Sequence, residues 1–483
     1  MDAMETRATK RPWWRRHRRK LVALVVLIGI GPAAHVIIGA TTPIAPPKID
    51  LPVGIAGAYT RMRAGVREVY LEGTPEQIGA QHARLLRDRM VQNEGELWQD
   101  FARFVPLAPA RTLITDVSRV RYRHVDRGFP DARLRELAAE ARAFEPDPYT
   151  SRMPTFQRMV FLHALYDIAL SFEHSPLIGC TAFGLGAGAT DDGHVLLGRA
   201  FDFEAGEVFD RDKAVFFVKG DGVIPFASVA WPGLVGVMSG MNLEGVAVIV
   251  NGARAGEPQT EGMPVIYSLR DVLERAHDTG EAIAILREQR PMVSHIVFVA
   301  DARGRFAVVE RAPGYDAFVR ESWKDSERVA VTNHLEGPLA ADPKNQVVRN
   351  GTTTLARRAR IDELVAAVGP HEANAARAVA MLRDHSCAAG TSCSVGDRRT
   401  IDALIATHGI VADTTDRALW VSAGPHLSGK FVRFDLRAIF ATGHAPGNDP
   451  EPLVIADDPI LGTPEYAAGR ARAGAPKIGG DAP

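Results

Sequence analysis

The periodicity of apolar side chains changes at Cys180, and this change constrains the fold more than any other feature. Upstream, the segment 155–172 (TFQRMVFLHALYDIALSF) carries apolar residues at the spacing of one helix face. Downstream, short apolar or alternating runs follow one another, separated by turn sequences such as DDG, GDG and NLEG. Strands joined by hairpin turns form antiparallel sheets, so we expect an α+β fold with mostly antiparallel sheets packed against helices.

The chain divides into segments of different composition. A capping box, TPEQ at 74–77, opens the helical region. The 57 basic and 58 acidic side chains leave no cationic excess for nucleic acid, which we therefore do not expect as a partner. The expected order along the chain is a basic tail (1–20), an apolar segment (21–40), a proline-rich linker (41–60), a helical region (61–179), a β-rich domain (180–447) and a disordered tail (448–483).

The apolar segment 21–40 follows a basic run, KRPWWRRHRRK, at 10–20. Twenty helical residues span about 30 Å, the thickness of a bilayer core. Lysine and arginine on the N-terminal side predict that this end stays in the cytoplasm. We therefore expect a single-pass transmembrane anchor in the inner membrane, with the rest of the chain on the periplasmic side. The alternative is a cleaved signal peptide and export, since the apolar run 21–30 has the length of a signal core.

The chain has three cysteines. Cys387 and Cys393, in HSCAAGTSC, are close enough in sequence to form a disulfide in an exported protein. Cys180 is then left as an unpaired thiol. The spacing in HSCAAGTSC matches no common zinc pattern, and no nucleotide motif is found, so we expect neither a metal nor a cofactor.

The passage CTAFGLGAGATDDGHVLLGRAFDFE reads as a β-hairpin that begins at Cys180. A hairpin returns its second strand beside its first, so Arg199 and Asp202 are expected close to the cysteine. An arginine beside a thiol lowers its pKa and raises the thiolate fraction. The aspartate could hold an ammonium group or pair with the arginine. A purely structural Arg–Asp pair is the alternative.

The set GCT…GRAFD…MNLEGVAVIVNGA…VTNH resembles the N-terminal-nucleophile (Ntn) cysteine hydrolases. Within them it is most similar to the acyl-coenzyme A:6-aminopenicillanic acid acyltransferase-like branch, which is related to the choloylglycine and penicillin V hydrolases. EGTPEQIGAQHARLL resembles a stretch of that branch's pro-segment. The resemblance covers about 69–436 and implies an αββα sandwich, with two mostly antiparallel sheets between helical layers.

The resemblance also implies a chemistry. In this family the precursor cleaves itself before the cysteine, so the Cys180 thiol would attack the Gly179 carbonyl and the thioester would be hydrolysed. The freed α-amine, with an ordinary pKa of about 7.7–8.0, would serve as general base. The helical region 61–179 would be the pro-segment and stay bound to the catalytic domain 180–447 as a separate chain. The substrate would be a small molecule with an acyl or amide group.

Further site residues follow by matching the family's motifs. Arg199 and Asp202 would line the nucleophile. Asn251 and Asn333 would donate hydrogen bonds to the oxyanion of the tetrahedral intermediate. The family's late arginine corresponds to Arg357 or Arg358 in TTTLARRARI, and the sequence does not choose between them.

Two other readings remain open. One is a papain-like thiol hydrolase that pairs Cys180 with His334 or His163, although papain-like enzymes place their cysteine at the start of a helix and this one begins a strand. The other is a membrane-tethered binding protein in which the cysteine is inert. The acyl donor, its acceptor and the balance between hydrolysis and transfer are left open.

Overall fold

The computed structural model describes residues 13–171, 178–203, 206–322 and 328–473. The chain forms two compact units. One comprises Met1–Ile44 and Phe101–Arg123, and the other comprises Ala45–Asp100 and His124–Pro483. Every residue that the sequence motifs nominate for chemistry belongs to the second unit. Within the basic tail, residues 1–12 lie outside the described residues, as do 474–483 at the other end of the chain.

The first unit is helical. It contains α1 (Trp13–Val25), a π-helical turn (Val26–Ile30), α2 (Gly31–Thr41) and α4 (Ala108–Arg121). The His35 ring lies 2.9 Å from an Asp116 carboxylate oxygen, and Arg119 donates to the Gly39 carbonyl at 3.3 Å. These contacts fix α2 against α4.

The expected membrane anchor at 21–40 is wrong. The apolar run is divided among α1, the π-helical turn and α2. The first part of α1, residues 13–20, belongs to the basic run. Among the helices of the described residues, none combines the length and the apolar character that a bilayer crossing requires. The predictions of a single-pass inner-membrane protein and of a periplasmic catalytic domain are therefore corrected.

The second unit contains two sheets. In the larger one, the strands follow the order β1-β2-β5-β6-β7-β8-β9-β10-β11, and neighbours are antiparallel except for the parallel pair β2 and β5. The bounds are β1 (Tyr59–Arg63), β2 (Val66–Gly73), β5 (Ala214–Gly220), β6 (Phe226–Ala230), β7 (Ser239–Asn242), β8 (Ala247–Gly252), β9 (His295–Ala300), β10 (Phe306–Arg311) and β11 (Phe318–Ser322).

The smaller sheet is antiparallel throughout and has the order β12-β3-β4-β13-β14-β15-β16. Its strands are β12 (Arg328–Val331), β3 (Ile178–Leu185), β4 (Leu196–Phe203), β13 (Ala406–Asp413), β14 (Ala418–Ser422), β15 (Phe431–Asp435) and β16 (Val454–Ile455). The hairpin predicted to begin at Cys180 is the pair β3 and β4.

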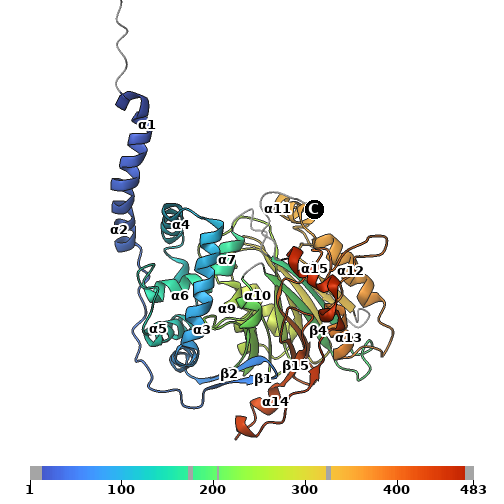
Figure 1. Ribbon diagram of the computed structural model, residues 1–483. Coiled ribbons are helices and arrows are strands. Elements are labelled where there is room, and N and C mark those ends of the chain that lie inside the picture. The colour runs from blue at the N-terminus through green and yellow to red at the C-terminus, as the bar shows by residue number, and fades with distance from the viewer. Residues whose placement is uncertain (1–12, 172–177, 204–205, 323–327, 474–483) are drawn as a thin grey trace, which may run out of the picture. The chain divides into compact units, whose positions relative to one another are not determined.

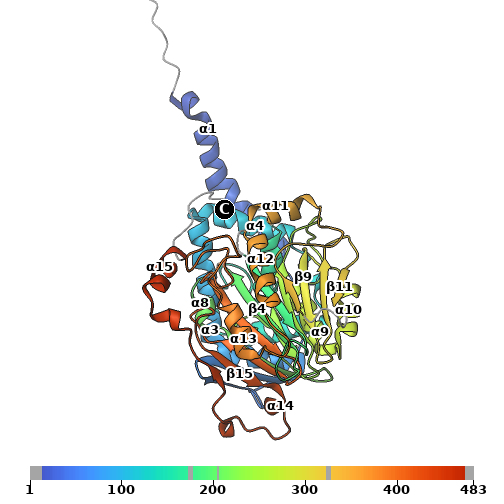
Figure 2. The same cartoon turned by 90° about the vertical axis from the view of Figure 1, so that its right-hand side faces the viewer.

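Helices cover the outer faces of both sheets. Helices α9 and α10 contact the larger sheet, and α12 and α13 contact the smaller one, as Figures 1 and 2 show. The helices of this unit are α3 (Pro75–Phe104, up to Asp100), α5 (Asp131–Ala143), α6 (Thr155–His163), α7 (Leu165–Leu170), α8 (Val208–Arg211), α9 (Val265–Arg275), α10 (Thr279–Glu288), α11 (Pro343–Gly351), α12 (Thr354–Ala366), α13 (Ala375–Leu382), α14 (Leu436–Ile439) and α15 (Pro464–Ala473).

Side chains of β3 and β4 alternate between two cores. Ala182 and Leu197 belong to the core between the two sheets, whereas Phe183 and Leu196 belong to the core under α12 and α13. This alternation follows from the period of two along a strand. The described residues therefore show the expected layers of helix, sheet, sheet and helix.

Two segments differ from the expectation. The region 61–179 does not begin with a helix, because β1 and β2 form a hairpin that joins the larger sheet beside β5. The predicted capping box then opens α3: Thr74 N–H donates to Gln77 at 2.8 Å, and Gln77 N–H donates back to Thr74 at 3.3 Å. The segment expected to be a disordered tail carries β16 and α15, and Tyr466 of α15 is buried.

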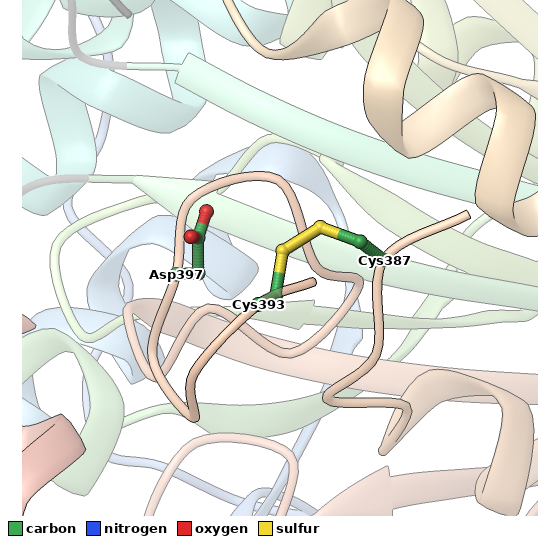
Figure 3. A group of neighbouring side chains, drawn as sticks. All are labelled: Cys387, Cys393 and Asp397. Atoms are coloured by element: carbon green, nitrogen blue, oxygen red, sulfur yellow. A yellow bond between two sulfur atoms is a disulfide. The ribbon is translucent and has the colours of Figure 1, made fainter. Parts of the chain in front are cut away.

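Cys387 and Cys393 are joined by a disulfide, with their Cα atoms 5.6 Å apart. Asp397 lies beside the bridge (Figure 3). Because the two sulfur atoms are bonded to each other, this group offers no thiolate to a metal ion.

The close contact between Gly198 and Phe183 predicts that Gly198→Ala destabilises the fold. The two residues are paired across β3 and β4, and a Cβ on Gly198 would overlap the Phe183 ring, with a third ring atom only 2.9 Å away. We expect a loss of about 1–3 kcal/mol in the free energy of unfolding, measured by guanidinium denaturation. Gly351→Ala is the control, since no atom lies within 4 Å of its Cβ position, and it is expected to change stability by less than about 1 kcal/mol. Equal losses in both variants would contradict the account.

Candidate active site

The Cys180 thiol lies between the two sheets. Along β3 and β4, Cys180 is opposite Phe201 and Ala182 is opposite Arg199. Because paired residues on antiparallel strands point to the same face, the thiol, Arg199 and Phe201 all face the space between the sheets. The Cys180 side chain has no exposed surface. The guanidinium Nη2 of Arg199 lies 3.7 Å from the thiol sulfur, so the hairpin brings this arginine to the cysteine as expected.

Arg199 also connects the two sheets. From the smaller sheet it donates to the Met238 carbonyl at 2.8 Å, to the Ser239 hydroxyl and to the Val250 carbonyl. Ser239 and Val250 belong to β7 and β8 of the larger sheet. The guanidinium carbon lies 4.3 Å from the centre of the Phe201 ring. These contacts hold the cation in one orientation beside the sulfur.

Burial has the largest effect on the pKa of the Cys180 thiol. It raises the pKa of Cys180 above the ordinary value, the charge of Arg199 opposes this rise, and the charge of Asp202 adds to it. The expectation that Arg199 would raise the thiolate fraction is therefore outweighed by desolvation. In the intact chain the sulfur is a neutral thiol that needs a base to lose its proton.

Asp202 lies on the opposite face of β4 from the thiol. It is paired with Gly179, and a Cβ on Gly179 would lie 3.6 Å from both the Asp202 carboxylate and Nη2 of Arg357. Gly179 thus sits between an acidic and a basic side chain. The peptide bond between Gly179 and Cys180 therefore has a carboxylate and a guanidinium group near it, on the face of the sheet that the helices cover.

Arg357 of α12 reaches the nucleophile's backbone. It donates to the Cys180 carbonyl, to the Thr181 hydroxyl at 3.0 Å and to Oδ1 of Asn333 at 2.8 Å. Arg358 instead binds Asp362 at 2.9 Å and Glu336 at 2.7 Å, both at the surface. Of the two candidates for the late arginine, the structure brings Arg357 to Cys180.

Asn333 accepts a hydrogen bond from the backbone N–H of Cys180 at 2.7 Å. Its amide nitrogen donates to the Gly252 carbonyl at 3.0 Å. Asn251 donates to the Thr332 carbonyl at 3.1 Å, and its own oxygen is buried without a hydrogen-bond partner among the described residues. Both asparagines are therefore near the nucleophile, but in this state they donate to backbone carbonyls. Their expected role as oxyanion donors stays a prediction.

The two histidines of the papain-like alternative have other partners. In the described residues, Nδ1 of His334 lies 3.1 Å from the Thr354 hydroxyl, and Nε2 lies 4.0 Å from Glu336. His163 uses both ring nitrogens, on the Met159 carbonyl at 2.8 Å and the Val235 N–H at 3.0 Å. Burial lowers the pKa of each ring to about 4. Among the described residues, neither ring is hydrogen-bonded to the Cys180 thiol.

A possible metal group lies away from the thiol. Nδ1 of His194 is 2.7 Å from Asp413 and 3.3 Å from Asp192, near the turn between β3 and β4. The short contact to Asp413 is an ion pair, which satisfies the ring without a metal.

The sequence motifs did not identify Tyr166 or the cavity beside it. Tyr166 lies on α7, and its hydroxyl is buried without a hydrogen-bond partner among the described residues. Burial raises its pKa, and the charge of Cys180 adds to the rise, so the phenol is near the thiol. Tyr166 and Phe201 line a cavity of about 130 Å³. The alternation along β4 predicts that Phe201 shares a face with the thiol, but no motif marks the helix residues.

The contacts of Arg357 predict that Arg357→Ala is strongly destabilising. It would leave the Cys180 carbonyl and Asn333 oxygen buried without their charged donor, which costs about 2–5 kcal/mol in the free energy of unfolding. Arg358→Ala is the matched control, because it removes only surface ion pairs worth at most about 1 kcal/mol each. Urea denaturation of both variants measures the difference. A larger loss for Arg358→Ala would show that the wrong arginine has been assigned.

Comparison with known proteins agrees with the motifs. Residues 189–408 match the family model described as acyl-coenzyme A:6-aminopenicillanic acid acyl-transferase. The match begins nine residues after Cys180 and includes Arg199, Asn251, Asn333 and Arg357. A curated protein of Archaeoglobus fulgidus, described as uncharacterized, is 26% identical over 253 residues, which are 49% of this chain and 41% of that protein. The chain therefore spans about two fifths of the length of the curated relative it matches.

Three solved structures are similar at low sequence identity. An N-acylethanolamine-hydrolyzing acid amidase ortholog from Caenorhabditis elegans has 16% identity and a TM-score of 0.36, over 49% of this chain and 93% of the other. Penicillin V acylase from Agrobacterium tumefaciens has 16% identity and a TM-score of 0.32, over 50% and 82%. A conjugated bile acid hydrolase variant from Clostridium perfringens has 12% identity and a TM-score of 0.33, over 58% and 97%.

The motifs around the nucleophile and the family match lead to the same assignment. Residues 189–408 match the model of the acyl-coenzyme A:6-aminopenicillanic acid acyl-transferase family, the same branch of the Ntn cysteine hydrolases that the sequence motifs resemble.

Proposed function

We propose that this protein is a self-processing cysteine amidohydrolase or acyltransferase that acts on an amide or thioester of a small molecule. One observation carries the proposal: three side chains converge on a single residue. Arg199 contacts the Cys180 thiol, Asn333 accepts from its backbone N–H, and Arg357 donates to its carbonyl. A merely structural cysteine in a strand has no need of such an arrangement.

The first proposed step is self-cleavage. The Cys180 sulfur attacks the Gly179 carbonyl carbon, the C–N bond to Cys180 breaks, and the nitrogen takes the thiol's proton to become an amine. Water then hydrolyses the thioester, which leaves a Gly179 carboxylate and a free thiol. Gly179 has no side chain to obstruct the attacked carbonyl.

The second proposed step uses the amine that cleavage releases. This amine takes the proton of the Cys180 thiol while the sulfur attacks the substrate's carbonyl, and it gives the proton to the leaving amine as the C–N bond breaks. The acyl group is then held as a thioester, which water or another acceptor removes. The raised pKa of the buried thiol explains why a base on the same residue is needed.

The neighbouring side chains have distinct proposed tasks. Asn333, which accepts from the Cys180 N–H at 2.7 Å, would orient the freed amine. Asp202, beside Gly179, would stabilise that amine when it is protonated. Arg199 would stabilise negative charge on the sulfur, and Asn251 would contribute to the oxyanion site.

The two parts of the processed chain would stay together. Strand β2 pairs along its length with β5 of the later part. Buried ion pairs add to this contact: Arg270 of α9 lies 2.7 Å from Glu136 of α5, and Glu274 lies 3.3 Å from Arg133. Removing one partner of a buried pair costs about 3–5 kcal/mol, so these contacts oppose separation.

The proposal predicts that the purified protein consists of two polypeptides, residues 1–179 and 180–483, that elute together in gel filtration. Intact-mass measurement and N-terminal sequencing should find Cys180 as a new N-terminus. Cys180→Ala should remain a single chain, because no sulfur is present to attack Gly179. His334→Gln is the control for the papain-like alternative and should be cleaved normally. An uncut wild-type chain that turns over amides would contradict the proposal.

The amine base predicts the direction of the pH dependence. Below its pKa, ordinarily about 7.7–8.0, the α-amine carries a proton and cannot accept another. The value of kcat/KM should therefore rise with pH and level off above that pKa, falling about tenfold for each pH unit on the acid side. The pH profile for a chromogenic acyl anilide measures this. A profile that stays flat down to about pH 5, well below that pKa, would exclude the amine as base.

A further inference from the structure

A cavity beside the nucleophile is lined almost entirely by apolar side chains but contains a buried carboxyl group. Phe201, Trp231 and Met159 are among its lining residues, together with Glu140 of α5. Its volume of about 130 Å³ is close to that of an engineered apolar cavity that holds benzene. A group of about six carbon atoms therefore fits.

Phe201 places the cavity beside the nucleophile. The thiol itself does not line the cavity in the described part of the chain. Phe201 is the residue paired with Cys180 across β3 and β4, and it shares the inward face with the sulfur. Met238, whose carbonyl accepts from Arg199, also lines the cavity.

Glu140 lacks a hydrogen-bond partner. It has no exposed surface, and neither carboxyl oxygen has a partner among the described residues. Nδ1 of His82 lies 4.0 Å from Oε1 of Glu140, which is too far for a hydrogen bond. Nδ1 of His82 is likewise buried without a partner in the described residues.

Burial favours the uncharged form of both groups. Burial and the charge of Glu136 raise the pKa of Glu140 well above its ordinary value, with Arg270 opposing. Burial lowers the pKa of His82 to about 3. Nε2 of His82 accepts from the Gly233 N–H at 3.0 Å, so its proton is on Nδ1. With Glu140 in the uncharged form that burial favours, the pair offers two donors, the carboxyl O–H and the ring N–H, and one acceptor, the carboxyl C=O.

The fold gains nothing from leaving these groups unpaired. An unsatisfied buried polar group destabilises a protein by about 1–3 kcal/mol. At the cavity, Glu94 pairs with Arg158 at 2.7 Å and both ring nitrogens of His163 have partners, whereas the Tyr166 hydroxyl and Oδ1 of Asn93 have none among the described residues. Glu140 and His82 are distinguished by their proximity: two unpaired groups 4.0 Å apart, one of them lining the cavity, could bind a single ligand atom together.

We propose that the cavity receives the acyl part of the substrate, and that Glu140 and His82 hydrogen-bond an uncharged oxygen at the end of this group remote from the scissile bond. A hydroxyl or keto oxygen fits, because it can accept from both donors or exchange hydrogen bonds with the carboxyl group. The proposal rests on the proposed function. It adds that the substrate is an oxygenated acyl group of about six carbons.

The orientation follows from the two ends of the cavity. Tyr166 lines the end near the thiol, since its electrostatic neighbours are Cys180 and Arg199. Glu140 has Glu136 and Arg270 as its charged neighbours, and Cys180 is not among them. A carbonyl at the thiol therefore places the far end of the acyl group toward Glu140.

The test compares pairs of acyl 4-nitroanilides that differ by one oxygen: hexanoyl with ω-hydroxyhexanoyl, and pentanoyl with ω-hydroxypentanoyl. For the wild-type protein, kcat/KM for the oxygenated member should be about 10–100 times greater, since the plain analogue leaves buried groups unpaired. Glu140→Leu should reduce this ratio to about one. Met159→Leu, which changes the cavity wall but not its polarity, should retain the ratio.

Stability gives an independent readout of Glu140. If its carboxyl group serves a ligand, Glu140→Leu should raise the unfolding temperature of the free protein, because it removes an unpaired polar group. A lowered temperature together with an unchanged substrate ratio would assign Glu140 to the fold and overturn the proposal. An unchanged ratio alone would overturn it as well, because the pair would then be satisfied by water.

A binding measurement separates this proposal from the proposed function. Calorimetry on the Cys180→Ala protein compares para-cresol with toluene, which need no reaction. Tighter binding of para-cresol that Glu140→Leu abolishes supports the polar pair even if no anilide is hydrolysed, an outcome that would count against the proposed function. Hydrolysis of both members of each pair at equal rates would retain the proposed function and overturn the assignment of Glu140.

Discussion

The buried guanidinium of Arg199 is the contact on which the arrangement of the site depends. It belongs to β4 of the smaller sheet and donates to acceptors at Met238, Ser239 and Val250 on or beside the larger sheet. Hydrogen bonds to matched acceptors stabilise a buried cation, so these contacts favour the register in which the two sheets meet. The same register places the guanidinium 3.7 Å from the Cys180 sulfur. The same guanidinium therefore both joins the two sheets and positions the cation beside the nucleophile.

The hairpin of β3 and β4 divides the site between the two faces of one sheet. Cys180, Arg199 and Phe201 face the space between the sheets, where a substrate carbonyl would meet the sulfur. Gly179 and Asp202 face α12, where Arg357 binds the backbone of the nucleophile. On the proposed mechanism, groups that act on the peptide bond and its freed amine lie on one side and groups that act on the sulfur lie on the other. One strand thereby serves both steps without one set of side chains obstructing the other.

The sequence predicted the features that depend on local periodicity. Alternation and turn residues predicted the hairpin, and the hairpin predicted that Arg199 approaches Cys180. Features that depend on distant packing were not predictable. The apolar run 21–40 does not reveal its π-helical turn or the contact of His35 with Asp116. The rise in the pKa of Cys180 comes from burial under the second sheet. The choice of Arg357 over Arg358 depends on which face of α12 packs on the sheet, and the direction of the hydrogen bond from Cys180 to Asn333 depends on where the chain turns after β12.

The cavity shows how substrate choice could vary independently of the nucleophile. Its lining residue Glu140 comes from α5 and the neighbouring His82 from α3, and both helices precede the proposed cleavage site, whereas Phe201 and Trp231 follow it. The earlier part of the chain is tied to the later part by β2 and by the buried pair of Glu136 with Arg270, so it can complete the cavity after cleavage. Substitutions in α3 or α5 would then alter the group recognised at the far end of the cavity. They would leave unchanged the contacts of Arg199, Asn333 and Arg357 with Cys180, which come entirely from the later part.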